Sequence, residues 1–189
     1  MSKRVADVLV ETLEAAGVKR CYGIVGDTLN RIAHAIDRSE IEWVHMRHEE
    51  AGAFAAAAEA QFTGGLTACA GSCGPGSLHF INGLYEANRN RAPVILIATQ
   101  IVRQDIGFES IQEVDFNDVY KGCSVYCETI LTPEQARAQN GRCLPGGIDE
   151  ARRRRADRAN RHRQCSRARR SAVRGSCAAP AGSPDRRRS

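Results

Sequence analysis

A single carboxylate and a glycine-rich turn are the residues of this sequence best suited to chemistry. Glu49 lies in the stretch Arg47-His48-Glu49-Glu50, directly before an alanine-rich segment, and the turn Gly74-Pro75-Gly76 follows further along the chain. Because glycine has no Cβ and adopts positive φ, such a turn lets a flat ring approach the backbone. The pair therefore indicates a cofactor site.

Both features also have a purely structural explanation. Glu49 is a favourable acid for the first turn of a helix predicted over 49–63, because the helix N-terminus carries partial positive charge. The turn at 74–76 could simply precede the helix predicted over 76–90. Glu50 fits the structural role better, and we assign it no chemistry.

Apolar runs alternate with helical patterns along the chain, which predicts an α/β fold with a parallel sheet and helices on both faces. Glu49 would then lie between a strand end and a helix N-terminus, where binding sites collect in open parallel sheets. The run 93–98 is continuous and β-branched, as is typical of a central parallel strand, and 41–44 is also predicted to be buried. The predicted strands are 20–24, 41–45, 66–70, 93–98 and 124–127. The predicted helices are 5–16, 29–36, 49–63 and 76–90, with a helical turn near Phe116 and a last helix beginning at Pro133.

Four segments together resemble the N-terminal pyrimidine-binding domain of thiamine-diphosphate-dependent enzymes. Within that family the resemblance is closest to the pyruvate oxidase and quinone-dependent pyruvate dehydrogenase branch. It covers a predicted domain over residues 1–138, and the segments follow the order and spacing of the family. They are Gly23–Asn30, Arg47–Glu50, Gly71–His79 and Ile81–Ala87.

The resemblance implies a role for each candidate residue. Glu49 would be catalytic, bonding to the N1′ nitrogen of the cofactor pyrimidine and favouring its imino tautomer. The other residues expected to contact the cofactor are Val25, Gly74, Pro75 and Gly76. The residues expected on the substrate side are Gly26, Thr28, His79 and Gln112, and no residue is assigned to a metal.

Local explanations remain for some of these residues. Asp27 or Thr28 could instead cap the helix that follows, and Gln112 could be an ordinary loop residue. Relatives usually have Phe-Gln-Glu where this sequence has Ile111-Gln112-Glu113. The missing aromatic leaves the exact substrate open.

The resemblance also implies what a complete enzyme would need. Relatives bind Mg²⁺ through a Gly-Asp-Gly motif followed by Asn-Asn on a separate domain, and oxidases hold FAD on a middle domain. Neither motif occurs in this sequence. We expect a truncated chain that supplies half a site and is inactive alone. A diphosphate-binding domain of a partner subunit, in a homodimer or homotetramer, would complete the site for pyruvate or a related 2-oxo acid.

Two other functions are compatible with the same residues. An acetolactate-synthase-like carboligase has the same N-terminal motifs. A non-catalytic fragment that dimerises or binds nucleic acid belongs to a different class of function.

Charge divides the chain into two parts. Residues 151–189 hold fourteen arginines against two aspartates, whereas the rest of the chain is acidic on balance. With a single valine and no aromatic residue, this stretch cannot form a core, and we predict an arginine-rich disordered tail over 139–189. After Ala138 the sequence resembles out-of-frame translation of a GC-rich gene, so we expect no specific nucleic-acid partner, although an RNA- or DNA-binding arm is the alternative.

The sequence predicts a cytoplasmic protein. The N-terminus lacks a cleavable apolar run, and no apolar stretch reaches the ~18 residues that span a bilayer. Of the eight cysteines, Cys69-x3-Cys73 and Cys123-x3-Cys127 have the wrong spacing for a zinc knuckle. Free thiols in a reducing compartment are expected, with peripheral membrane contact implied only for full-length relatives.

Overall fold

The fold is a parallel α/β sheet, described by a computed structural model over residues 3–136. The predicted boundary at residue 138 and the predicted tail lie outside the described residues. Within them, four parallel strands form one sheet in the order β2-β1-β3-β4. The strands are β1 (Arg20–Gly23), β2 (Glu42–His45), β3 (Thr67–Gly71) and β4 (Val94–Ala98). The predicted fold class is confirmed.

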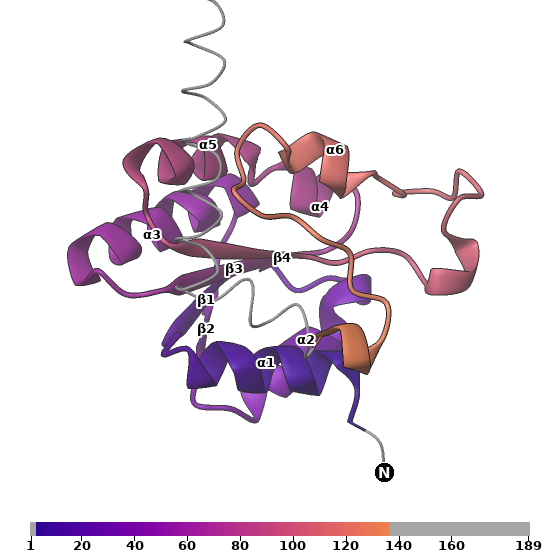
Figure 1. The fold of residues 1–189 in the computed structure, drawn as a ribbon, viewed down its shortest axis with the longest axis horizontal. Coiled ribbons are helices and arrows are strands. Elements are labelled where there is room, and N and C mark those ends of the chain that lie inside the picture. The colour runs from indigo at the N-terminus through magenta and orange to yellow at the C-terminus, as the bar shows by residue number, and fades with distance from the viewer. Residues whose placement is uncertain (1–2, 137–189) are drawn as a thin grey trace, which may run out of the picture. The chain divides into compact units, whose positions relative to one another are not determined.

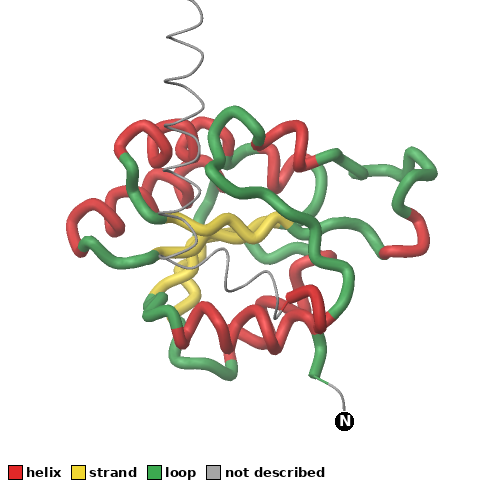
Figure 2. The backbone as a smooth tube through the Cα atoms, in the orientation of Figure 1, coloured by secondary structure: helices red, strands yellow, loops and turns green. Residues whose placement is uncertain are grey.

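Helices cover both faces of this sheet (Figures 1 and 2). On one face lie α1 (Val5–Ala15) and α2 (Asn30–Asp37), and on the other lie α3 (Glu49–Thr63) and α5 (Ile81–Asn90). The larger core cluster packs the apolar sides of α1 and α2 against the sheet. The shorter helices are η1 (Asp27–Leu29), α4 (Pro75–Leu78), η2 (Arg103–Asp105) and α6 (Phe116–Tyr120).

The central strand is not the one that the sequence predicted. All five residues of β3 are buried, whereas β4 is at one edge of the described sheet and only Ile97 of its residues is buried. β2 forms the other edge of the described sheet. Ile41, just before it, is buried as predicted, but residues 42–44 are not. The small side chains of β3 allow helices to pack closely on both faces, and this packing buries it more completely than hydrophobicity alone predicts.

Small residues bring α3 and α5 into close contact. The buried face of α3 consists of glycine and alanine, namely Gly52, Ala53, Ala56, Ala57 and Ala60. A Cβ placed on Gly83 of α5 would lie 2.5 Å from the Ala53 Cβ and 2.8 Å from the Phe54 backbone nitrogen. The helices therefore meet backbone to backbone at Gly83.

The helix predicted over 76–90 is interrupted. The structure has α4 and α5 in its place, separated by His79 and Phe80. Phe80 is fully buried, and its N–H donates to the Ser77 carbonyl three residues back, which tightens the turn. The break directs Phe80 into the core while His79 stays half-exposed.

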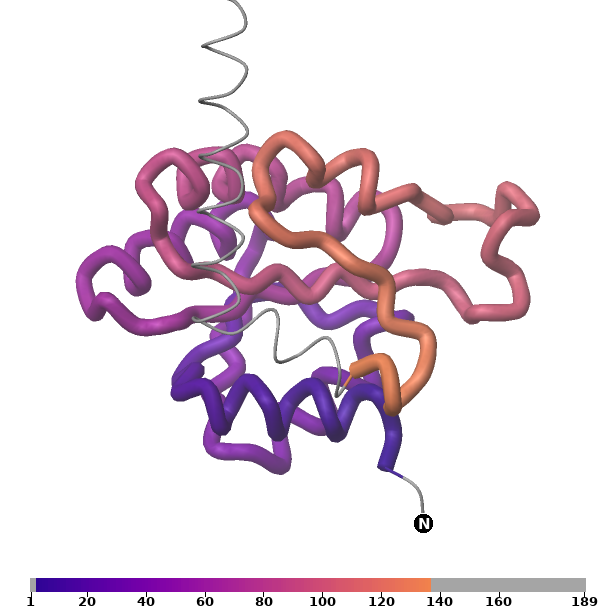
Figure 3. Tube along the Cα trace, in the orientation of Figure 1, coloured from indigo at the N-terminus to yellow at the C-terminus, as the bar shows by residue number. Residues whose placement is uncertain are grey.

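The strand predicted over 124–127 is absent, and the chain enters this segment from a turn. The N–H groups of Cys123 and Ser124 both donate to the Tyr120 carbonyl, closing the turn after α6. The segment then runs from the layer of α5 and α6 to the layer of α1 and α2 (Figure 3). As predicted, a helical turn begins at Pro133, and it is described as far as Ala136.

None of the helices within residues 3–136 has both the length and the apolar character needed to cross a membrane.

The contact at Gly83 predicts that alanine substitution at two helical glycines has very different effects on stability. Gly83→Ala should lower the free energy of unfolding by about 1–3 kcal/mol, because the new methyl group meets backbone that cannot move aside. Gly52→Ala should have a much smaller effect, since its Cβ would meet the flexible Met46 side chain at 3.3 Å. Urea unfolding followed by circular dichroism measures both. Equal stability of the two variants would show that the helices are not in backbone contact.

Candidate functional site

The predicted site residues all follow the carboxyl ends of the parallel strands. The loop after β1 carries Val25, Gly26 and Thr28, and α3 begins with Glu49 shortly after β2. The residues that follow β3 are Gly74, Pro75, Gly76 and His79, while Gln112 lies in the long loop after β4. Since parallel strands end at the same edge of a sheet, the fold gathers these segments on one side, as expected for a ligand site.

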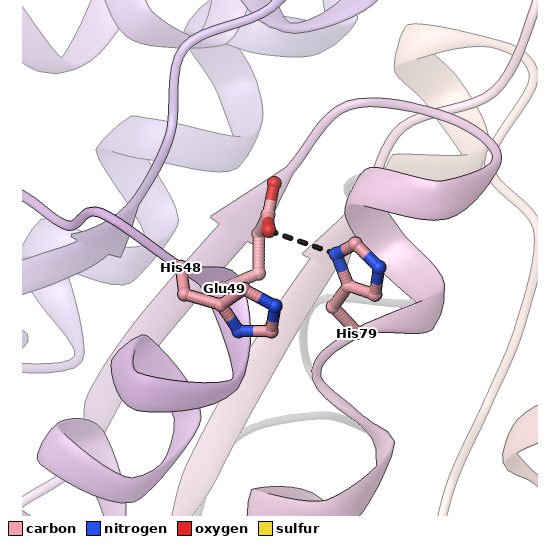
Figure 4. Close-up of side chains that lie close together, drawn as sticks. All are labelled: His48, Glu49 and His79. Atoms are coloured by element: carbon pink, nitrogen blue, oxygen red, sulfur yellow. Dashed lines mark hydrogen bonds and ion pairs between the residues drawn. The ribbon is translucent and has the colours of Figure 1, made fainter.

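Glu49 is the best-defined side chain of the site. It is the first residue of α3, and its side chain is only 12% exposed. Its Oε2 lies 3.0 Å from Nδ1 of His79, at the break between α4 and α5 (Figure 4). When Glu49 is ionised, the Nδ1–H tautomer of His79 donates this hydrogen bond. The structure thus brings together two residues that the sequence assigned to the cofactor and substrate sides.

The other oxygen of Glu49 faces the glycine turn. A Cβ on Gly76 would lie 3.4 Å from Oε1. Within residues 3–136 the structure gives Oε1 no hydrogen bond. The turn itself needs glycine at Gly74, whose φ is +66°, and Pro75 begins α4 at a position that suits its fixed φ. Glycine at residue 76 therefore places no side chain against Oε1.

His48 is a member of the site that the sequence analysis did not identify. Its ring stacks on that of His79 with centroids 4.7 Å apart and planes inclined by 24°. Its Nδ1 accepts the N–H of Glu50 at 3.3 Å, so His48 also caps α3. Its position directly before an acid-rich first turn was the one available signal.

Hydroxyl groups bind three of the strand-end loops to one another. The Oγ1 of Thr28 lies 2.9 Å from Ser72 Oγ and 2.8 Å from Thr99 Oγ1. It also accepts the N–H of Cys73 at 3.0 Å. Thr28 therefore holds the start of the glycine turn in place. Sequence reasoning missed Ser72 and Thr99, although each directly follows a strand and that position was a usable signal.

Gln112 packs directly on the turn. A Cβ on Gly74 would lie 2.7 Å from the Cβ of Gln112, so a larger residue at 74 would displace it. The Sγ of Cys73 also donates to its Oε1 at 3.6 Å, a weak bond. Gln112 has φ +67°, which is uncommon for a residue other than glycine.

Val25 and Gly26 border the same edge. A Cβ on Gly26 would lie 2.6 Å from the Ser72 Cβ, so the loops after β1 and β3 touch there. Val25 is 44% exposed, and its place in the loop does not by itself tie it to Glu49.

Glu50 points to a different neighbour. Its Oε1 accepts from Asn82 Nδ2 at 2.8 Å, which links α3 to α5. This geometry agrees with the structural role assigned to it.

Buried neutral groups lie beneath the site. Burial raises the pKa of the Cys21 thiol to about 12, and it raises the pKa of Cys69 in β3 well above the usual range. Burial also raises the pKa of Tyr120, whose hydroxyl donates to the Ser77 carbonyl. These groups stay uncharged near neutral pH.

Comparison with known proteins identifies the family. Residues 3–119 match the family described as "Thiamine pyrophosphate enzyme, N-terminal TPP binding domain". The chain is 50% identical over 149 residues to an uncharacterized 42.6 kDa protein in the isoamylase 3′ region of Pseudomonas amyloderamosa, covering 78% of this chain and 36% of that protein. It is 39% identical over 148 residues to a pyruvate oxidase of Lactiplantibacillus plantarum, covering 77% of this chain and 23% of the oxidase.

Similarity extends to a second kind of enzyme in the same group. Acetolactate synthase 1 from Oryza sativa is 32% identical over 130 residues, covering 68% of this chain and 20% of that enzyme. The chain thus spans between 20% and 36% of the length of these relatives. The chain belongs to the thiamine pyrophosphate enzyme family, as its N-terminal TPP-binding domain.

Proposed function

We propose that this chain forms the pyrimidine half of a thiamine diphosphate site, in an enzyme of the pyruvate oxidase or quinone-dependent pyruvate dehydrogenase type. The observation that carries the proposal is the arrangement at Glu49. One oxygen is hydrogen-bonded to His79, and the other faces Gly76, which places no side chain against it. This arrangement suits a ring nitrogen, which needs a hydrogen-bond partner and room for a flat ring.

Glu49 would hold a proton in common with the N1′ nitrogen of the pyrimidine through Oε1. His79 fixes the carboxylate through Oε2, so the side chain need not reorganise when the ring binds. When bound, thiamine diphosphate supplies the electron sink for decarboxylation of a 2-oxo acid. Glu49 would tune that chemistry by controlling the proton at N1′.

The turn and its supports would position the ring and line the substrate side. Gly74, Pro75 and Gly76, together with Val25, would contact the cofactor. Thr28 holds the turn through the N–H of Cys73, and Gln112 packs against Gly74. With Gly26 and His79, these two residues would border the 2-oxo acid.

The other half of the site would come from elsewhere in the assembly. Because the chain matches 36% or less of its relatives' length, we propose that a diphosphate-binding domain with Mg²⁺ completes the site in a homodimer or homotetramer. FAD would belong to the complete oxidase. A cytoplasmic location is part of the same proposal.

Two observations bear on the choice of reaction. Identity is higher to the pyruvate oxidase, at 39%, than to the acetolactate synthase, at 32%. This difference favours oxidative decarboxylation of pyruvate over carboligation. The acetolactate-synthase-like activity remains the second candidate because the same domain serves both enzymes. A non-catalytic role in dimerisation or nucleic-acid binding has no support within the described residues.

The proposal predicts unequal effects of two neighbouring carboxylates on cofactor binding. Glu49→Gln should weaken binding of thiamine diphosphate, and of the free aminopyrimidine half, by roughly 10- to 100-fold. A charge-assisted hydrogen bond contributes about 1.5–3 kcal/mol, and each 1.4 kcal/mol changes affinity about ten-fold. Calorimetric titration of the full chain measures both ligands.

Glu50→Gln is the matched control, since it removes the adjacent carboxylate and leaves Oε1 of Glu49 unchanged. It should alter the affinity by no more than about two-fold. Equal losses from the two substitutions would refute the assignment of Glu49. If thiamine diphosphate binds through its diphosphate alone and the free aminopyrimidine does not bind, the pyrimidine site is refuted.

The hydroxyl group of Thr28 generates a second prediction. Thr28→Val keeps the shape of the side chain but leaves the Cys73 N–H without its acceptor, so stability should fall by about 1–3 kcal/mol. Thr28→Ser keeps the hydroxyl and should restore most of the loss. Thermal unfolding of both variants provides the measurement. If Thr28→Val is as stable as the wild type, Thr28 does not hold the turn.

A further inference from the structure

The two histidines and Glu49 together form a cluster with a metal-ligating composition. Each of His48, Glu49 and His79 offers one ligand atom, and these atoms all lie within 4.8 Å of one another. They come from the start of α3 and the break before α5, which are held together by backbone contact at Gly83. The sequence analysis assigned no metal ligand, because His79 lies 30 residues from Glu49 in the chain.

The geometry points to a site for a zinc-class divalent cation formed by His48, Glu49 and His79. Two imidazoles and one carboxylate suit Zn²⁺, Cu²⁺ or Ni²⁺ rather than Mg²⁺ or Ca²⁺, which prefer oxygen ligands. Three protein ligands with an open fourth position are a donor set that zinc accepts.

The distance between Glu49 and His79 is close to the value that a metal requires. Bonds of about 2.0–2.1 Å in a tetrahedral site place neighbouring ligand atoms roughly 3.3 Å apart. The Glu49 Oε2 and His79 Nδ1 atoms are 3.0 Å apart. A cation can therefore replace the proton that these atoms share, and the proton would leave to water.

His48 can supply the third ligand after a small movement. Its Nδ1 accepts the Glu50 N–H at 3.3 Å, so this nitrogen carries a lone pair in a long and weak bond. Its ring is a neighbour of the His79 ring, with centroids 4.7 Å apart (Figure 4). Because both rings are half-exposed, neither is locked in place by packing.

Charge around the cluster also favours a cation. The positive end of the α3 dipole opposes one, but Glu49 and Glu50 both lie in that first turn. The Oε2 of Glu50 is 3.9 Å from Nδ1 of His48. These two carboxylates outweigh the partial charge of about half a unit at the helix end.

Direct metal binding tests the site. Untagged full chain, stripped of metal, is titrated with Zn²⁺ by calorimetry and with Co²⁺ by visible absorption. We expect one ion per chain and a Co²⁺ spectrum without the near-ultraviolet bands of thiolate ligation. His79→Ala and His48→Ala should each weaken binding by roughly ten-fold or more.

His34→Ala is the matched control, because His34 is exposed on α2 and outside the cluster. It should leave the affinity within two-fold of the wild type, and circular dichroism checks that each variant folds. The site is refuted if neither cluster variant changes the affinity, if thiolate bands dominate, or if millimolar Zn²⁺ does not bind.

A cation on Oε2 would weaken pyrimidine binding at Oε1, because it withdraws negative charge from the same carboxylate. This consequence rests on the proposed function, while the metal site itself does not. Zn²⁺ should therefore raise the apparent Kd of the aminopyrimidine in proportion to its own occupancy. If Zn²⁺ binds as expected without competing, the metal site is supported and the pyrimidine assignment of Glu49 fails.

Discussion

The site depends on how closely α3 approaches α5. Gly83 has no side chain, and the face of α3 opposite it is made of glycine and alanine, so the two backbones touch. Ordinary helix pairs lie about 8–10 Å apart, according to the side chains between them. A larger residue at this contact would move Glu49 away from His79 and break the 3.0 Å bond between them. The smallest residues of the chain, glycine and alanine, thus determine the hydrogen bond between Glu49 and His79.

A second set of contacts fixes the turn that faces Glu49. The strands bring the loops to one edge, but strand pairing ends at Gly71 and does not specify the path beyond it. Thr28 fixes that path through its hydrogen bonds to Ser72, Thr99 and the Cys73 N–H. Helix packing therefore positions the carboxylate, while the hydroxyl groups position the turn. The proposed pyrimidine site requires both supports.

Local signals predicted the parts of the fold that local physics determines. The bounds of α3 agree with the prediction because acids mark its start and Gly64, at φ +70°, ends it. Strand order is not local, so the apolar run at 94–98 indicated burial without revealing that β4 is an edge strand. The strand predicted at 124–127 is absent, and its first N–H, that of Ser124, bonds to the Tyr120 carbonyl of the turn after α6. Ser72 and Thr99 were missed because their bonds to Thr28 span 44 and 71 residues.

The central claim is that Glu49 shares a proton with a pyrimidine nitrogen next to the glycine turn. The most direct measurement is the ¹⁵N resonance of the N1′ atom in labelled thiamine diphosphate bound to the chain. The account predicts that this resonance moves toward the position of a protonated nitrogen in the wild type and not in Glu49→Gln. The same N1′ resonance in both proteins, at saturating ligand, would contradict it.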